Sequence, residues 1–240
     1  MNPFSFSKNY LNNYLMSKIL IISKKKWDKK NYGFCKNSKK FILSNKINLK
    51  KINQIQPRII FFMFWSNRIS RKIFSNFLCI QFHSSNLPKF KGGSPIQNQI
   101  LNKINKTKLT AFRINDKIDS GDICMKSNIF LNGKAENIYR NIEKKAVQMI
   151  KIISKRKKIS FKKQKGLSSF YRRRKPFQSN ISNVINKEPN RIYDFIRMLD
   201  ADSYPKAYLV SGNKKFELYD VILKKRVVSG KFLIRKNKKK

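Results

Sequence analysis

Short, continuously apolar runs are the feature of this sequence that most constrains its fold. Residues 17–23 and 59–65 are dominated by Ile, Leu and Phe, and residues 39–44, 79–83 and 109–114 form shorter runs that are partly apolar. Such runs, bounded by polar segments, are typical of strands buried on both faces. Sheets of buried strands carry helices on both sides. We therefore predict an α/β fold with a Rossmann-like, doubly wound, mostly parallel sheet.

A helix start follows the run at residues 79–83. Ser94 can cap a helix, Pro95 suits the first helical position, and Gln97 stands where a capping box requires a Glu or Gln. One buried face is expected to carry three isoleucines at helical spacing, Ile96, Ile100 and Ile104. The pattern therefore predicts a helix over residues 94–104.

The later part of the chain combines helices with an antiparallel pair of strands. Helical periodicity extends over residues 135–154 and again over residues 190–199. Residues 216–223 and 227–234 alternate between apolar and polar side chains, with a turn expected at residues 224–226. We expect these last elements to form a small C-terminal α+β domain.

Composition excludes several classes of protein. Hydrophobic residues make up 40% of the 240 residues, which suffices for a packed core, and no apolar run approaches the roughly 20 residues of a membrane span. A G-x-G-x-x-G fingerprint and a P-loop are both absent from the sequence. Three cysteines without a CxxC pair, and one histidine, indicate a reducing compartment and no metal site. We expect a cytoplasmic protein that is neither a membrane protein nor a nucleotide-dependent dehydrogenase or kinase.

The formal net charge of +44 permits two interpretations. A surface this positive favours a polyanionic partner such as RNA. The abundance of Lys together with Asn, Ile and Phe also fits a bias toward A- and T-rich codons, in which case the lysines are solvated surface. The charge alone does not choose between them.

His83, the only histidine, stands where a predicted strand ends. Ligands of open α/β sheets bind outside the carboxyl ends of the strands. In the loop that follows, Gly92 and Gly93 allow close approach of the backbone to a ligand. Alternatively, His83 is a strand-end residue that merely packs.

A second polar segment collects acidic side chains. Asp116, Asp119 and Asp122 lie within seven residues, in a chain that has only 12 acidic residues. Acids are thus concentrated in one loop against a basic background. A surface turn is the alternative, because Asp-Ser-Gly favours turns strongly.

Together these segments resemble the formyltransferase superfamily that uses 10-formyltetrahydrofolate. The matching text, in order along the chain, is Gln81-Phe82-His83, Leu87-Pro88, Lys91-Gly92-Gly93-Ser94-Pro95-Ile96-Gln97 and Ile118-Asp119-Ser120-Gly121-Asp122. The resemblance extends through Phe170–Pro176 and residues 196–208 to a tail like the small C-terminal domain of some members. The resemblance and the composition along the chain together give four segments: an extension over residues 1–16, a catalytic domain over 17–155, a basic linker over 156–170 and a small domain over 171–240. Met16 directly precedes the first strand, so either the chain starts there or the first sixteen residues are a loose extension.

The resemblance implies catalytic roles for His83 and Asp119. An imidazole can take the proton of an attacking amine or stabilise developing charge, and a neighbouring carboxylate fixes the orientation of the ring. Gln81 stands where the superfamily has Asn, whose amide would donate to the oxyanion. Because positions 81 and 83 share a strand face, Gln81 can still point at the site. The extra methylene of Gln81 displaces the amide donor. Three consequences remain open: the pocket has adjusted, the activity is low, or a backbone N–H replaces the amide as the donor.

The resemblance also implies the ligands. The co-substrate 10-formyltetrahydrofolate is expected along the loop from Ile114 to Asp122 and at an apolar strand end, without a metal or nucleotide cofactor. The folate-binding residues predicted in this way are Phe62, Met63, Ile114, Asn115, Ile118 and Asp122.

The acceptor amine is less constrained. The basic cluster Arg172, Arg173 and Arg174, with Gly92 and Gly93, favours initiator methionyl-tRNA as the acceptor. The small C-terminal part instead favours a nucleotide-linked amino sugar, and the arginines are then a solvated linker. A third reading, suggested by Gln81 and the extreme charge, is a degenerate RNA-binding module without catalysis. The sequence leaves the oligomeric state open.

Overall fold

The computed structural model describes residues 17–25, 29–36, 38–202 and 204–237. The expected extension over residues 1–16 therefore lies outside the described residues. The chain divides into two compact units, each assembled from separate segments. The first comprises the described residues of Met1–His83, Leu109–Ser127 and Glu143–Gly166; the second comprises those of Ser84–Lys108, Asn128–Ile142 and Leu167–Lys240.

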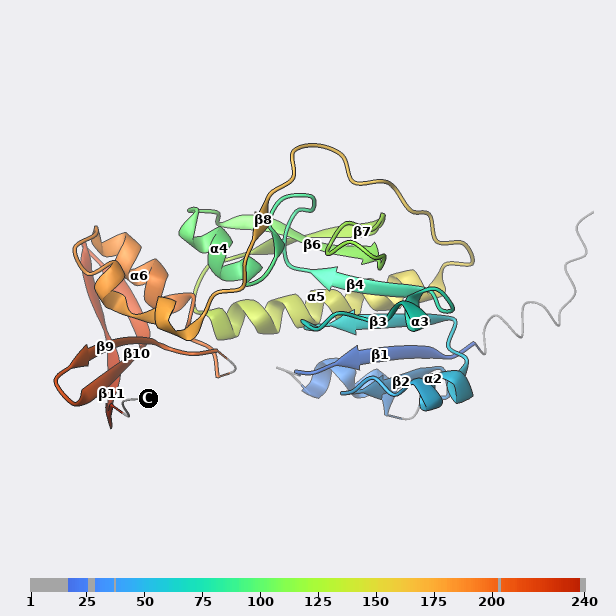
Figure 1. Cartoon of the computed structure of the whole chain (residues 1–240), viewed down its shortest axis with the longest axis horizontal. Helices are drawn as coiled ribbons and strands as arrows, with labels where there is room; N and C mark the ends of the chain where they lie inside the picture. Colours follow the sequence, from blue (N-terminus) through green and yellow to red (C-terminus); the bar gives the residue numbers. More distant parts are fainter. Residues whose placement is uncertain (1–16, 26–28, 37, 203, 238–240) are drawn as a thin grey trace, which may run out of the picture. The chain divides into compact units, whose positions relative to one another are not determined.

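A six-stranded sheet forms the predicted mostly parallel layer (Figure 1). Its order is β2-β1-β3-β4-β6-β7. The neighbours β2, β1, β3 and β4 run parallel, whereas β6 runs antiparallel to β4. The strands span Ile19–Ser23 (β1), Phe41–Ser44 (β2), Ile59–Met63 (β3), Cys79–His83 (β4), Lys106–Arg113 (β6) and Ile123–Phe130 (β7). The fold class is as predicted, but β7 was not foreseen from the sequence.

The central strands are buried on both faces, as continuous apolar runs require. Every residue of β1 and of β3 is buried. On one face Leu20, Phe62 and Cys79 pack in a core cluster with Ile52 of α2 (Leu49–Ile55) and Ile73 of α3 (Arg71–Phe74). The side chains of these central strands therefore belong to the core of the unit.

The long helix α5 (Ala135–Lys155) confirms the helix expected over residues 135–154. Within the first unit, the Arg58 guanidinium donates to the Ser154 carbonyl oxygen at 2.7 Å. Asn31, in the 3₁₀ helix η1 (Lys29–Cys35), donates to the fully buried Glu143 at 3.3 Å. These polar contacts therefore hold the part of α5 from Glu143 onward, which belongs to the first unit.

The helix expected over residues 94–104 is shorter than predicted, and its cap is different. Helix α4 spans Pro95–Leu101, so Pro95 opens it as expected but Ile104 lies outside. Ser94 has a φ of 49° and its side chain makes no capping bond. Its hydroxyl accepts a hydrogen bond from the Arg174 backbone N–H at 3.2 Å and lies 2.9 Å from the Tyr204 hydroxyl. The expected capping role is thus wrong, because tertiary partners occupy the hydroxyl.

The expected capping box at Gln97 is wrong for a similar reason. Gln97 is fully buried and its amide donates to the Tyr139 hydroxyl and to the Met198 carbonyl oxygen, both at 3.1 Å. A buried amide must find partners within the protein, and here they belong to α5 and to the end of α6 (Pro189–Arg197). Strand β3 is also shorter than predicted: it ends at Met63, because Phe64 has a φ of 49° and leaves the strand conformation.

The C-terminal elements confirm the predicted antiparallel pair and add a strand. Helix α6 spans Pro189–Arg197, and a three-stranded sheet has the order β11-β10-β9. Strand β9 (Ala207–Ser211), which was not predicted, pairs with β10 (Lys214–Lys224), which turns into β11 (Val227–Lys236). The remaining short elements are β5 (Lys91–Gly92), β8 (Phe170–Tyr171), η2 (Pro176–Ser179) and η3 (Ile181–Asn183). Across the described ranges, no helix is both long and apolar enough to span a bilayer.

Candidate active site

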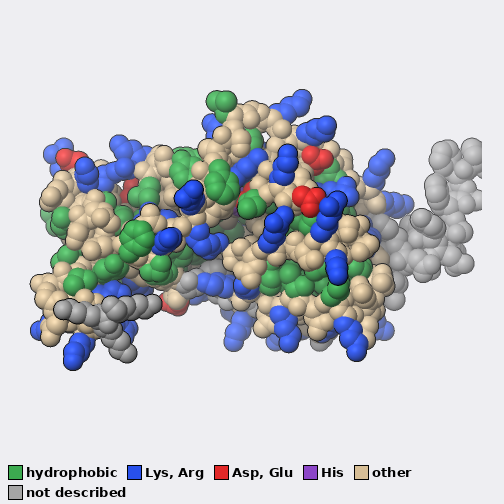
Figure 2. All heavy atoms as spheres, in the orientation of Figure 1, with side chains coloured by type: hydrophobic (Ala, Val, Ile, Leu, Met, Phe, Trp, Pro, Cys, Tyr) green, Lys and Arg blue, Asp and Glu red, His purple; other side chains and the backbone are tan. Residues whose placement is uncertain are grey.

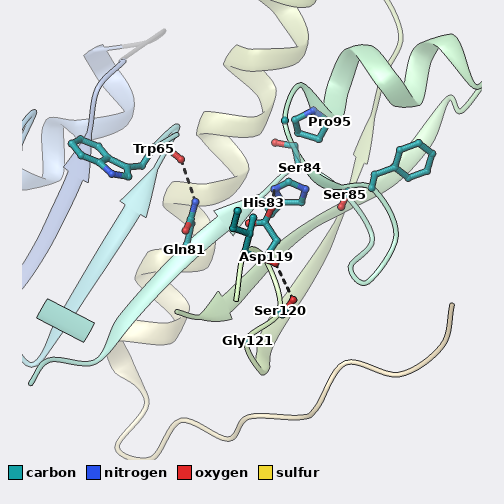
Figure 3. Close-up of polar contacts among 12 residues, drawn as sticks. Trp65, Gln81, His83, Ser84, Ser85, Pro95, Asp119, Ser120 and Gly121 are labelled. Atoms are coloured by element: carbon teal, nitrogen blue, oxygen red, sulfur yellow. Dashed lines mark hydrogen bonds and ion pairs between the residues drawn. The ribbon is translucent and has the colours of Figure 1, made fainter. Parts of the chain in front are cut away.

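His83 and Asp119 lie together in the first unit, as predicted (Figure 3). His83 is the last residue of β4, and Asp119 comes from the loop between β6 and β7. The imidazole Nδ1 and the carboxylate Oδ2 are 3.6 Å apart, and both side chains are less than a tenth exposed. Two polar side chains distant in sequence thus share one largely dehydrated position at the end of a parallel strand.

This geometry suits an oriented imidazole. A carboxylate on the Nδ1 side favours the tautomer in which that nitrogen carries the proton, so that Nε2 becomes the basic atom. The 3.6 Å separation slightly exceeds a hydrogen bond, and contacts of this kind often tighten only when substrate binds. The pair can therefore accept a proton at Nε2 and stabilise the resulting charge.

Backbone contacts shape the loop that carries Asp119. Asp119 itself has a φ of 49°, in the left-handed region that non-glycine residues rarely adopt. The Ser120 hydroxyl donates to the Ile118 carbonyl oxygen at 2.9 Å, and the Arg113 N–H donates to the Asp122 carbonyl oxygen at 2.8 Å. The loop is thus closed on itself and onto the end of β6.

Gly121 packs against the end of β6 where no other residue fits. A Cβ added at Gly121 would lie 1.5 Å from the Arg113 carbonyl oxygen. The close approach requires glycine, two residues after the candidate catalytic carboxylate. The Asp-Ser-Gly sequence therefore does more than form a surface turn.

Gln81 shares the strand face of His83 but is engaged elsewhere. Its amide nitrogen donates to the Trp65 carbonyl oxygen at 3.2 Å (Figure 3). An amide has two N–H donors, so this bond uses one of them. Donation from Gln81 to the reacting centre stays a prediction. The donor would be the second N–H of the amide, which the bond to Trp65 does not use.

Three of the predicted folate-binding residues belong to the core. Phe62 and Met63 are fully buried, and the Tyr32 hydroxyl lies 3.8 Å from the Met63 sulfur. Ile114 is 9% exposed, and its backbone N–H donates to the Cys79 carbonyl oxygen. Their side chains therefore pack in the core, and contact of these residues with folate stays a prediction.

The other three lie in the loop before β7. The side-chain oxygen of Asn115 accepts a hydrogen bond from the Lys117 N–H at 3.1 Å. Ile118 is 63% exposed, and Asp122 is half-buried. An exposed apolar side chain beside a buried carboxylate is what a ligand surface requires, but folate binding by these residues stays a prediction.

The residues predicted to bind the acceptor meet in the second unit. Strand β5 pairs in parallel with β8, which brings Gly92 and Gly93 beside residues 171–173. A Cβ at Gly92 would lie 2.3 Å from the Tyr171 carbonyl oxygen, and one at Gly93 would lie 2.4 Å from the Arg173 Cα. The close approach that these glycines permit is therefore to the chain's own backbone rather than to a ligand.

The three arginines next to this strand pair differ in their surroundings. Arg172 and Arg173 are exposed. Arg174 is half-buried, donates to the Gln178 carbonyl oxygen at 2.5 Å and lies over the Phe195 ring at 5.8 Å. Burial lowers the pKa of Arg174. Arg172 and Arg173 thus keep free surface for a phosphate, whereas Arg174 is engaged within the unit.

Other catalytic chemistries find little support among the described residues. Burial raises the pKa of Cys79 to about 12 and that of Cys124 to about 11, so both are protonated at neutral pH. No group of three His, Cys, Asp or Glu side chains in the described ranges has the geometry of a metal site. One functional candidate that the sequence pattern did not reveal is Gln164, which contacts the Asp119 loop from within a run of lysines.

Two family models match the chain. The model described as formyl transferase matches residues 20–158, and the model described as the C-terminal domain of methionyl-tRNA formyltransferase matches residues 176–235. The first alone covers more than half of the 240 residues.

Individual proteins agree with these models. The chain is 32% identical over 120 residues to a methionyl-tRNA formyltransferase of Campylobacter fetus, a match that covers 49% of this chain and 40% of that protein. The matched parts span less than two thirds of the curated relatives' lengths, from 24% to 56%. A solved methionyl-tRNA formyltransferase from Clostridium thermocellum has a TM-score of 0.84 and 35% identity, covering 92% of this chain and 99% of that one.

A more distant structure shares the fold alone. HypX from Aquifex aeolicus, solved in complex with tetrahydrofolic acid, has a TM-score of 0.69 at 13% identity. The match covers 86% of this chain and 38% of HypX.

Proposed function

Because the chain belongs to the formyl transferase family, we propose that it transfers a formyl group from 10-formyltetrahydrofolate to a primary amine. The observation that carries the proposal is the pairing of the single imidazole with the Asp119 carboxylate, 3.6 Å apart and buried, at the end of β4. An oriented base in a largely dehydrated position is what acyl transfer to an amine needs.

The proposed reaction balances with one proton acceptor. The amine nitrogen bonds to the formyl carbon, the bond from that carbon to N10 of the folate breaks, the amine loses a proton and N10 gains one. His83 takes the amine proton at Nε2 and is the source of the proton for N10. Asp119 holds the ring in place and stabilises the imidazolium.

The oxyanion of the tetrahedral intermediate needs a hydrogen-bond donor. We assign this role to the second N–H of the Gln81 amide, because the first donates to Trp65 and because Gln81 shares the face of His83. Loss of one such donor typically costs roughly a hundredfold or more in rate.

For the donor substrate, the loop between β6 and β7 is the proposed surface. It offers the exposed Ile118 side chain and the half-buried Asp122 close to the candidate base. The side chains of Phe62, Met63 and Ile114 are in the core, so the proposed surface rests on the loop itself.

We propose methionyl-tRNA as the acceptor. The C-terminal family model and the Campylobacter and Clostridium relatives carry that name. Lys and Arg side chains are scattered over the visible face in Figure 2, with few acidic ones, and the net charge is +44. The exposed Arg172 and Arg173 are suitable contacts for phosphates of an acceptor stem.

One assay tests both donor and acceptor. Purified protein is given 10-formyltetrahydrofolate labelled in the formyl group, together with methionyl-tRNA or with dTDP- or UDP-linked amino sugars. Label on methionyl-tRNA supports the proposal, whereas label on a sugar alone refutes the acceptor. Protein that binds RNA but neither binds a folate analogue nor transfers label refutes the enzymatic function.

A further inference from the structure

The segment expected to be a basic linker contacts the candidate site. Within this segment, Lys162 forms an antiparallel bridge with Ile123, the first residue of β7. Lys162 and Ile123 exchange two backbone hydrogen bonds, of 2.8 and 2.9 Å. The Phe161 ring lies 6.0 Å from the Arg113 guanidinium. Residues 161–164 are therefore fixed to the loop that carries Asp119, and all of these residues belong to the first unit.

Gln164 makes the contact closest to the candidate catalytic carboxylate. Its amide nitrogen donates to the backbone carbonyl oxygens of Asp119, at 2.9 Å, and Gly121, at 2.8 Å. Because both partners are carbonyl oxygens, the NH₂ group must face them, which settles the orientation of the amide. The other end of the amide, its oxygen, is buried with no hydrogen-bond partner in the described ranges.

The Asp119 loop needs such support. A φ of 49° at Asp119 costs free energy for a residue with a side chain and persists only where the surroundings hold it. Gly121 and the Arg113–Asp122 hydrogen bond attach the loop to β6 on one side. Gln164 attaches the backbone on both sides of Ser120 to a different part of the chain. The direction of the Asp119 side chain toward His83 follows from this double attachment.

We propose that Gln164 is a positioning residue for the Asp119–His83 pair. It touches neither reacting atoms nor the imidazole in this assignment. It acts by fixing the backbone from which the carboxylate projects. The inference rests on the proposed formyl transfer only for its kinetic readout, since the geometry of the pair can be observed without turnover.

Gln164→Glu tests the proposal with almost no change in size. A carboxylate at this position turns oxygen toward two carbonyl oxygens, so both hydrogen bonds are lost. Lys165→Gln is the matched control, because it also lowers the net charge by one at an exposed neighbouring position. Gln164→Ala removes the amide without adding charge and serves if the Glu variant is poorly folded.

Two measurements separate positioning from general stability. Formyl transfer by Gln164→Glu should fall roughly 100-fold in kcat, with a smaller change in KM for the formyl donor, because a displacement of about 1 Å is enough for such a loss. The imidazole C–H signals of His83, the only histidine, should shift in the NMR spectrum of both Gln164 variants and stay in place in Lys165→Gln.

The outcomes are distinguishable. Folded Gln164→Glu and Gln164→Ala proteins with the wild-type kcat and the wild-type His83 signals would overturn the positioning role. Wild-type protein without transfer, whose His83 signals nevertheless move in both Gln164 variants, would refute the proposed function and support the positioning role. A fall in activity that is matched by Lys165→Gln would show an effect of charge and overturn the inference.

Discussion

Strands β1 and β11 are both rich in apolar residues, yet their surroundings are opposite. All five residues of β1 are buried, whereas nine of the ten residues of β11 are exposed. Val227, Phe232 and Ile234 of β11 are each more than half exposed. Apolar composition therefore indicates a strand in both cases, but it indicates burial only where both faces of the strand are covered. We infer that the two units contribute to function in different ways.

In the first unit, function depends on fixed positions. The core around Phe62 holds β4, whose last residue is His83, and backbone contacts hold the loop with Asp119. In the second unit, the exposed β11 and the exposed Arg172 and Arg173 offer surface and charge. Substitutions in the first unit should change rates sharply, and those in the second should change binding gradually.

His83→Ala should show the largest effect in this comparison. Removal of a general base typically costs 10²- to 10⁴-fold, so formyl transfer should fall by roughly that factor. Single-turnover rates and thermal unfolding are measured together. Ser154→Ala, which also truncates a buried polar residue of the first unit, is the control and should retain transfer. Turnover at the wild-type rate in folded His83→Ala would exclude the imidazole from the chemistry.

Substitution of one phenylalanine in each unit compares how much buried and exposed strands contribute to the free energy of unfolding. Phe62 is fully buried, so Phe62→Ala should lower the free energy of unfolding by about 3–5 kcal/mol. Phe232 is 56% exposed, so Phe232→Ala should cost about 1 kcal/mol or less. Urea titration of both variants measures the difference. Equal losses would mean that β11 is covered in solution, and the contrast between the strands would fail.

Much of the fold and of the site was predictable because it depends on local patterns. Predominantly apolar runs predicted β1, β3 and β4, and the position of His83 at the end of β4 followed from them. The pairing of His83 with Asp119 was inferred through resemblance, since no local pattern links residues so far apart. Strand β7 was not predicted, because most of its residues are half-buried or exposed and the strand therefore lacks a continuous apolar run.

Side-chain partners were the least predictable feature. Ser94 and Gln97 form a strong local capping pattern, yet both side chains bind tertiary partners instead. Gln164 stands among lysines and looks like solvated linker, although it holds the Asp119 loop. Gln81 was expected to face the reacting centre and donates to Trp65. In each case the polar group is satisfied by a residue that becomes its neighbour only after folding.

Gly121 allows a sharper test of fixed position in the first unit. Gly121→Ala places a Cβ against the Arg113 carbonyl oxygen, so the loop must move, at a cost of about 1–3 kcal/mol in stability. Transfer should fall by one to two orders of magnitude, by roughly the factor expected for a 1 Å displacement. Gly33→Ala is the control, because a Cβ there meets nothing within 4 Å. Unchanged kinetics in Gly121→Ala would mean that the position of the Asp119 loop does not limit the rate.

The smallest effect is expected where charge rather than position matters. Arg172→Glu combined with Arg173→Glu should raise KM for methionyl-tRNA about tenfold and leave kcat nearly unchanged, because phosphate contacts orient an acceptor without entering the chemistry. Each lost contact should also reduce the dependence of log KM on log salt concentration by a slope of about 0.7–0.9. Lys50→Glu combined with Lys51→Glu, on exposed α2 positions of the first unit, reverses the same charge and serves as the control. If the control raises KM as much as the arginine variant does, the attraction belongs to the net charge of the whole chain, and the second unit contributes no specific acceptor surface at these two residues.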